Sequence, residues 1–171
     1  AISNMPNSIK LVWKPHADKR VGYYRIEKYN TLLNEWILLK TVKERLQVEY
    51  LDTGLENNTS YKYRLKAFSF DDVESAPTKV VIGKTKPLPS GATNIRATNS
   101  EPKKIVISWN ASATDDVVKY EIHRSTFRAF GYEKVKEVNA NTFEYIDSTD
   151  VAGKSYYYKI IAVDKDGLES L

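Results

Sequence analysis

The sequence contains no cysteine, and this absence removes whole classes of function. None of its 171 residues can form a disulfide, a thiolate metal site or a cysteine nucleophile. The two histidines, His16 and His123, have no neighbours at zinc-ligand spacing. No apolar run approaches the ~20 residues of a membrane span, and no signal peptide is visible. We therefore expect no enzymatic activity, no metal and no cofactor.

The composition favours β structure without pointing to a charged partner. Hydrophobic residues make up 42% of the chain, and there are 12 tyrosines against seven glycines and one methionine. The net charge is +4, and it belongs to the front half, which has 15 Lys and Arg against 10 Asp and Glu up to residue 86. This mild bias does not indicate a nucleic-acid partner.

The chain repeats itself at a shift of 95 to 96 residues, with Trp, Tyr, Asp and Ala in matching places. The matching pairs are Ile9–Trp13 with Ile105–Trp109, Tyr24–Lys28 with Tyr120–Arg124, Tyr50–Thr53 with Tyr145–Ser148, and Ser60–Phe68 with Ser155–Val163. A shift held this closely indicates two copies of one domain.

Within each copy the hydrophobic period is two. Ile9, Leu11 and Trp13 alternate with Lys10 and Val12, as in a strand with one face on a core. Turn signals separate such short runs, and no long stretch has a helical period. The sequence therefore predicts antiparallel β-sandwiches.

Particular residues narrow the type of sandwich. Each repeat has a Trp on an early strand, and the late strand of repeat one reads Tyr-x-Tyr-x-aliphatic-x-Ala from Tyr61. Leu55 precedes Tyr61 by six residues, the spacing of a tyrosine corner. Both repeats resemble fibronectin type III domains, which implies an all-β fold of two tandem immunoglobulin-like antiparallel β-sandwiches.

We place the modules at 1–86 and 87–171, with a short linker at Lys86–Gly91 restrained by Pro87 and Pro89. Repeat one has few residues for its first strand, and repeat two stops before its last. We expect a fragment of a longer chain that carries further modules.

A basic row is expected on the outer face of module one. Lys62, Arg64 and Lys66 alternate with core residues on one strand, and Arg25 points outward from the strand expected beside it. The default interpretation is a solvated face with Glu27 as a local partner, and the alternative is a patch for an anionic ligand.

The turn after Trp13 differs in charge from its counterpart. In repeat one it reads KPHADKRV, whereas the turn after Trp109 reads NASATDDVV. The fold therefore does not demand the basic composition, and loops at this end of a sandwich often carry recognition. Pro15 restricts the turn, and Lys19 and Arg20 could pair with carboxylates.

This turn also resembles a specific motif. The stretch is similar to the fibronectin-binding segment of the Campylobacter-type fibronectin-like adhesin family, surface lipoproteins built from fibronectin type III modules. The matching positions are Trp13, Lys14, Pro15, His16, Asp18, Arg20 and Val21, while Ala17 replaces a second proline. The resemblance implies that host fibronectin binds this loop, including Lys19, and that the full protein is anchored by lipid to the bacterial outer membrane.

A second hypothesis belongs to another class. The modules could be structural spacers in a secreted multidomain protein such as a polysaccharide-degrading enzyme, and the rest of the gene would discriminate between the two. An intracellular muscle-type array also stays open. The acidic pairs Asp71–Asp72 and Asp115–Asp116 and the stretch Asp164–Gly167 are interpreted as turns rather than calcium sites.

Overall fold

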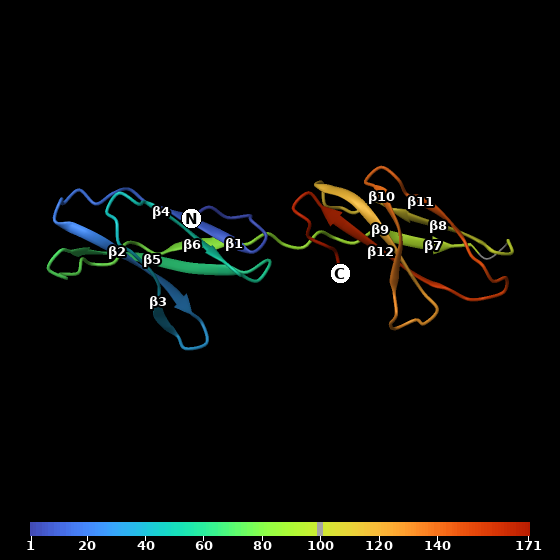
Figure 1. Ribbon diagram of the computed structural model, residues 1–171, viewed down its shortest axis with the longest axis horizontal. Helices are drawn as coiled ribbons and strands as arrows, with labels where there is room; N and C mark the ends of the chain where they lie inside the picture. The colour runs from blue at the N-terminus through green and yellow to red at the C-terminus, as the bar shows by residue number, and fades with distance from the viewer. Residues whose placement is uncertain (99–100) are drawn as a thin grey trace. The chain divides into compact units, whose positions relative to one another are not determined.

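A computed structural model describes residues 1–98 and 101–171, and these form two compact all-β units (Figure 1). The units are Ala1–Pro87 and Leu88–Leu171. Their boundary lies in the linker, one residue beyond the predicted position. Each unit is called a module below.

The first module packs a two-stranded sheet on a four-stranded sheet. Its strands are β1 (Ser8–Val12), β2 (Val21–Asn30), β3 (Glu35–Val42), β4 (Glu49–Thr53), β5 (Ser60–Ser69) and β6 (Val81–Lys84). β1 pairs with β4, and the larger sheet has the order β3-β2-β5-β6, with every pair antiparallel. The facing sides bury Ile9, Tyr24, Ile26 and Tyr63, none of which is more than 1% exposed.

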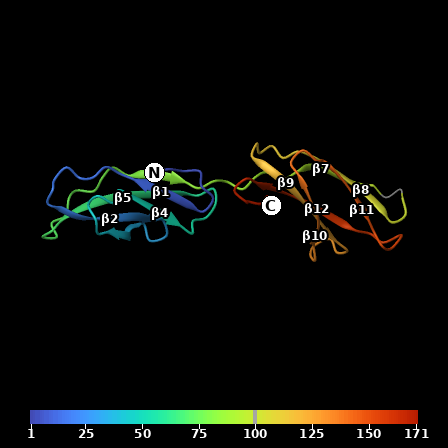
Figure 2. The same ribbon diagram turned by 45° about the horizontal axis from the view of Figure 1, so that its top comes forward.

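The second module has two three-stranded sheets, seen from another side in Figure 2. Its strands are β7 (Thr93–Ala97), β8 (Lys104–Asn110), β9 (Val117–Ser125), β10 (Glu133–Asn139), β11 (Glu144–Ser148) and β12 (Tyr157–Asp164). The sheet orders are β11-β8-β7 and β10-β9-β12, again antiparallel. Ile107, Trp109, Tyr120 and Ile122 form the centre of its core.

The repeat seen in the sequence is a repeat of strands. β1, β2, β4 and β5 correspond to β8, β9, β11 and β12 at the shift of 95 to 96 residues. The predicted fold class, two tandem antiparallel β-sandwiches, is confirmed. In module one the predicted tyrosine corner is present, because the Tyr61 hydroxyl accepts a hydrogen bond from the Glu56 amide at 3.0 Å while Leu55 is buried.

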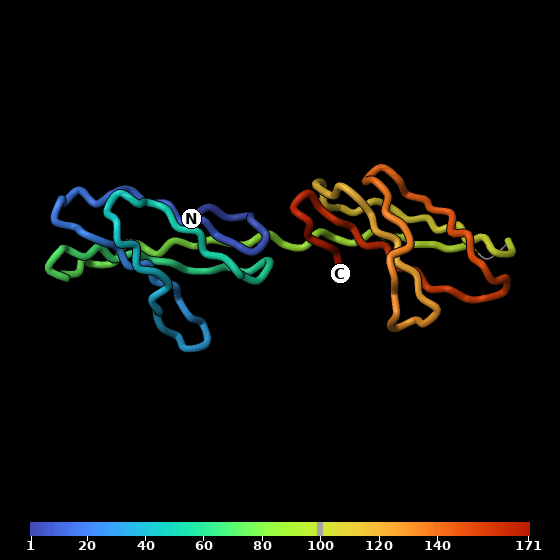
Figure 3. The backbone as a smooth tube through the Cα atoms, in the orientation of Figure 1, coloured from blue at the N-terminus to red at the C-terminus, as the bar shows by residue number. Residues whose placement is uncertain are grey.

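The modules differ at their sheet edges. In module two, β8 pairs with β7 on the edge opposite β11. In the described part of module one, the corresponding edge of β1 has only an isolated bridge between Ile2 and Lys10. Conversely, β5 pairs with β6, whereas β12 pairs only with β9 among the described strands. The tube in Figure 3 also shows the β2–β3 turn of module one extending away from the rest of that module.

Candidate functional site

The loop from Trp13 to Val21 joins β1 to β2 and is fastened to a buried tyrosine of the core. The hydroxyl of Tyr24, itself 1% exposed, accepts a hydrogen bond from the backbone amide of His16 at 2.8 Å. The Tyr120 hydroxyl accepts one from Ser112 at the same distance in module two. This anchor therefore belongs to the fold rather than to the sequence of either loop.

Internal hydrogen bonds then order the tip of the loop. The Asp18 amide donates to His16 Nδ1 at 3.1 Å, and the Arg20 amide donates to Asp18 Oδ1 at 2.9 Å. The Arg20 guanidinium also pairs with the Asp18 carboxylate, at 2.7 Å for the shortest contact. This hydrogen bond from Arg20 lowers the pKa of Asp18 to about 2. The charge of Arg20 is thus matched within its own loop.

The predicted loop residues divide into an anchor and an exposed tip. Val21 is buried, and Trp13 is half-buried with its ring edge on Tyr24, at a centroid distance of 5.8 Å. Asp18 is half-buried as well. The exposed residues are Lys14, Pro15, His16, Lys19 and Arg20.

A turn at residues 70–75, after β5, lies beside this loop. The Phe70 amide donates a hydrogen bond to the Arg20 carbonyl at 3.1 Å. The two segments enclose a hollow of about 330 Å³, called the loop-end groove, lined by His16, Asp18, Arg20, Phe70, Asp71 and Glu74 among others.

Sequence reasoning missed Phe70. The residue is 76% exposed and comes directly after β5, whose own residues follow the expected alternation. A signal was present: the second repeat has Lys165 at the corresponding place, so the fold does not require a ring there.

The predicted basic row is matched by local partners. Arg64 pairs with Glu27 and lies over the Trp36 ring at 4.4 Å, while Lys66 pairs with Glu74 at 3.3 Å. The remaining two cations lie over aromatic rings: Arg25 is 4.5 Å from the Phe68 ring, and Lys62 is 5.5 Å from the Tyr29 ring. Carboxylates therefore partner Arg64 and Lys66, whereas the aromatic rings leave the charges of Arg25 and Lys62 in place.

Asp116, Asp164 and Asp166 form an acidic cluster in module two, with carboxylate oxygens within 4.8 Å of one another. Asp164 Oδ1 accepts hydrogen bonds from the Asp166 and Leu168 amides, both at 2.9 Å. These bonds close the turn, in keeping with the turn interpretation of this stretch.

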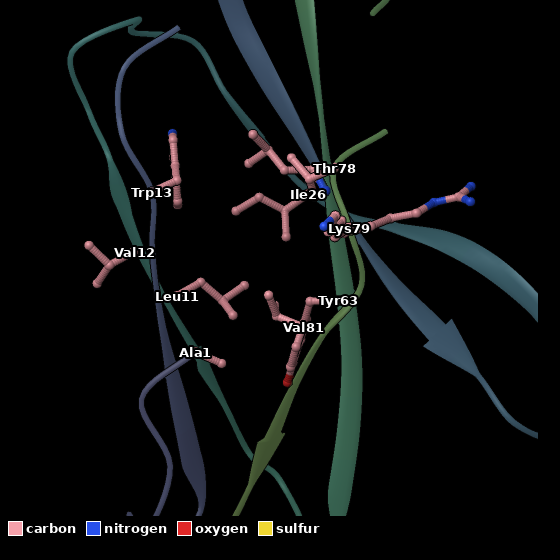
Figure 4. Close-up of a pocket in the computed structure, with 11 residues that line it drawn as sticks. Ala1, Leu11, Val12, Trp13, Ile26, Tyr63, Thr78, Lys79 and Val81 are labelled. Carbon is pink, nitrogen blue, oxygen red and sulfur yellow. Dashed lines mark hydrogen bonds between the residues drawn. The ribbon is translucent and has the colours of Figure 1, made fainter. Parts of the chain in front are cut away.

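A second hollow, of about 290 Å³, lies beside β1 in module one. Figure 4 shows Leu11, Val12 and Trp13 along one side of it, with Ile26 and Val81 on the other side. In module two the corresponding place beside β8 is taken by β7, which pairs with Ser108 and Asn110 through Arg96 and Thr93. The hollow therefore follows from the sheet-edge difference between the modules.

Among the described residues, no helix is long and apolar enough to cross a membrane.

The known proteins with similar sequences are enzymes. No protein-family model matches the chain. Exoglucanase B of Cellulomonas fimi is 30% identical over 128 residues, which is 69% of this chain and 11% of that protein. Amylopullulanases of Thermoanaerobacter thermohydrosulfuricus and Thermoanaerobacterium thermosulfurigenes are 35% and 37% identical over 65 and 67 residues, or 37% and 38% of this chain. The chain spans only 3% to 11% of the length of these relatives.

Solved structures of similar fold include chicken CNTN1 FN1–FN3 domains, with a TM-score of 0.47 and 15% identity, covering 99% of this chain and 62% of that one. A two-domain fibronectin type III segment of chicken tenascin gives a TM-score of 0.45 and 18% identity, with coverage of 99% and 91%. The sequence relatives are polysaccharide-degrading enzymes rather than adhesin lipoproteins. They favour the second hypothesis of the sequence analysis over the first.

Proposed function

We propose that the chain is a non-catalytic pair of fibronectin type III modules that acts as a spacer within a secreted, extracellular polysaccharide-degrading enzyme. The observation that carries this proposal is the 128-residue similarity to Exoglucanase B. Because neither module exceeds 87 residues, that match must run through both of them.

The contacts of the ionisable groups support a structural role. The pair of His123 with Glu121, at 3.2 Å, has the residue types of a general acid–base site. However, Glu121 is 8% exposed and also pairs with Lys134 at 3.1 Å and Lys119 at 3.4 Å. Desolvation raises the pKa of Glu121, but the hydrogen bonds from these three residues outweigh it and lower that pKa. A carboxylate held ionised among cations stabilises a sheet face and is poorly placed to carry protons.

The linker also suits a spacer. Pro87 and Pro89 fix two backbone φ angles within six residues, so the modules would be joined by a short and stiff segment.

The test is a deletion within the full-length enzyme. Replacing residues 1–171 by a short Gly/Ser linker should leave kcat on a small soluble substrate unchanged, because no catalytic group is removed. Hydrolysis of an insoluble polymer should fall, since the spacing of the other domains changes. The proposal fails if the isolated chain hydrolyses either substrate, or if the deletion abolishes activity on the small one.

A second candidate is the fibronectin-binding adhesin, anchored by lipid at the bacterial outer membrane with further modules in the same chain. It is favoured by one observation: Lys14, His16 and Lys19 are exposed on a loop that Tyr24 holds in place. The test compares binding of the native chain to immobilised fibronectin with that of a variant carrying the module-two loop. Equal binding by both chains, or binding by neither, would reject the loop as the adhesive site.

A further inference from the structure

The loop-end groove of module one has an aromatic ring that is both exposed and fixed. Phe70 is 76% exposed, yet its ring lies against the backbone of Gly22, where an added Cβ would be only 2.8 Å from Cδ1. The backbone of Phe70 is fixed as well, by the hydrogen bond from its amide to Arg20. A fixed ring offers contact area at low cost in conformational entropy.

The backbone conformation of Gly22 does not require a glycine. It is absent from the glycines of the described residues that have positive φ. It lies where the register between β2 and β5 shifts, between Val21 and Tyr23. The glycine thus makes room for Phe70.

The rim of the groove is polar but balanced in charge. Asp18 is paired with Arg20, and Glu74 with Lys66 at 3.3 Å. Because His16 Nδ1 accepts the Asp18 amide, Nε2 is left as the donor of the neutral imidazole. Asp71 adds an exposed carboxylate that can accept hydrogen bonds. A polyanion would find no surplus of cations here.

We propose that the loop-end groove binds a neutral polysaccharide chain, with the C–H face of one sugar ring on Phe70 and hydroxyl groups on His16 and Asp71. A sugar presents an apolar face and a hydroxyl edge together, which matches a fixed ring beside uncompeted donors and acceptors. The inference rests on the proposed function, since it assigns the spacer a contact with the polymer that the enzyme degrades.

Module two shows what the same place looks like without the ring. Lys165 stands where module one has Phe70, and its ammonium group is 3.8 Å from Asp116. Val118 stands where module one has Gly22. Module two therefore lacks both the aromatic ring and the glycine beside it, and we expect the sugar site in module one alone.

The test uses the 171-residue chain in native gels that contain pullulan, together with depletion of the chain by cellulose. The native chain should be retarded or depleted by at least one of the two glucans. Phe70→Ala should weaken that binding about tenfold or more. Phe70→Trp should retain it, because a larger ring still covers the sugar.

Two further variants separate the ring from general effects. Gly22→Val keeps Phe70 but displaces its ring, so it should weaken binding as Phe70→Ala does. Phe130→Ala removes a ring of similar exposure, 63%, from module two and should leave binding unchanged. Thermal melts of Phe70→Ala and Phe130→Ala should agree with that of the native chain, because both rings are largely in solvent.

Absence of glucan binding by the native chain, or equal binding by Phe70→Ala, would overturn the site. Retention on fibronectin that is lost with Phe70→Ala, without retention by either glucan, would also overturn it in favour of a protein partner. The spacer proposal is judged separately by the domain deletion, whose readout is hydrolysis rather than binding of this chain.

Discussion

The loop ends of the two modules share one hydrogen-bonded frame and differ in almost every exposed side chain. The amide of Phe70 donates to Arg20 at 3.1 Å, and the amide of Lys165 donates to Asp116 at 3.0 Å. These frame bonds join backbone groups of residues such as Phe70 and Lys165, whose side chains are exposed, so the bonds do not depend on which side chain is present. The comparison teaches that charge and aromatic character at this end can change without cost to the fold.

The cores repeat a second device, a buried carboxylate held between a tyrosine and a cation. Asp52 accepts from the Tyr63 hydroxyl at 2.7 Å and from Lys28 at 2.9 Å. Asp147 has the corresponding contacts with Tyr158 at 2.7 Å and Arg124 at 2.9 Å. Desolvation, followed by the hydrogen bond to Asp52, raises the pKa of Tyr63 well above its usual range. The pKa of Tyr158 is raised in the same way, by desolvation and then by the hydrogen bond to Asp147.

The largest expected effect comes from removing one of these carboxylates. Asp52→Ala would leave both the Tyr63 hydroxyl and the Lys28 ammonium without their partner, at a cost of roughly 5 kcal/mol to module one, the upper end of the range for a broken buried pair. Asp147→Ala should cost module two a similar amount. Hydrogen exchange followed by mass spectrometry measures each module within the intact chain. A loss of protection spread equally over both modules would contradict their independence.

Replacing the core tryptophan of each module should destabilise the two modules by different amounts. Trp109 is 3% exposed, whereas Trp13 is half-buried and lines the hollow beside β1. Trp109→Ala should therefore cost about 4 kcal/mol, near the middle of the range for buried aromatic residues, and Trp13→Ala about 2 kcal/mol. Urea titration read by hydrogen exchange gives both values. Equal costs would mean that the hollow does not reduce the packing of Trp13.

The sequence alone was enough to predict the two β-sandwiches and the loop that differs between them, but not the exposed Phe70. Period-two alternation and the repeat shift predicted the sandwiches, and the contrast of KPHADKRV with NASATDDVV located the differing loop. Phe70 was missed because its ring contacts Gly22 on another strand, and no periodic pattern in the sequence reports such a contact. The partners of the basic row were only partly foreseen: Glu27 could be named, but Trp36 comes from β3, whose register with β2 also shifts.

A smaller effect is expected from the tyrosine that fastens each loop. Tyr24→Phe removes the acceptor of the His16 amide and should cost about 1 kcal/mol, with Tyr120→Phe costing the same through Ser112. Amide exchange at His16 and Ser112, measured by NMR, should accelerate in the corresponding variant only. Unequal costs would show that the other hydrogen bonds of the two loops, such as Asp18 to His16 in module one and Thr114 to Ser112 in module two, hold them in place to different extents.

The smallest effect concerns the ion pair at the loop tip. The pKa of Asp18 is lowered from about 4 to about 2 by the hydrogen bond from Arg20. The pair therefore stabilises the loop above the ordinary pKa of aspartate, and this stabilisation is lost as the pH falls from about 4 towards 2. In Arg20→Ala the NMR-detected pKa of Asp18 should return towards its ordinary value, whereas Lys19→Ala should leave it unchanged. Because the pair is exposed, the melting temperature at pH 7 should be nearly the same in both variants. A pKa that stays low in Arg20→Ala would assign the shift to the backbone of the loop, and the charge of Arg20 would then be free for a partner.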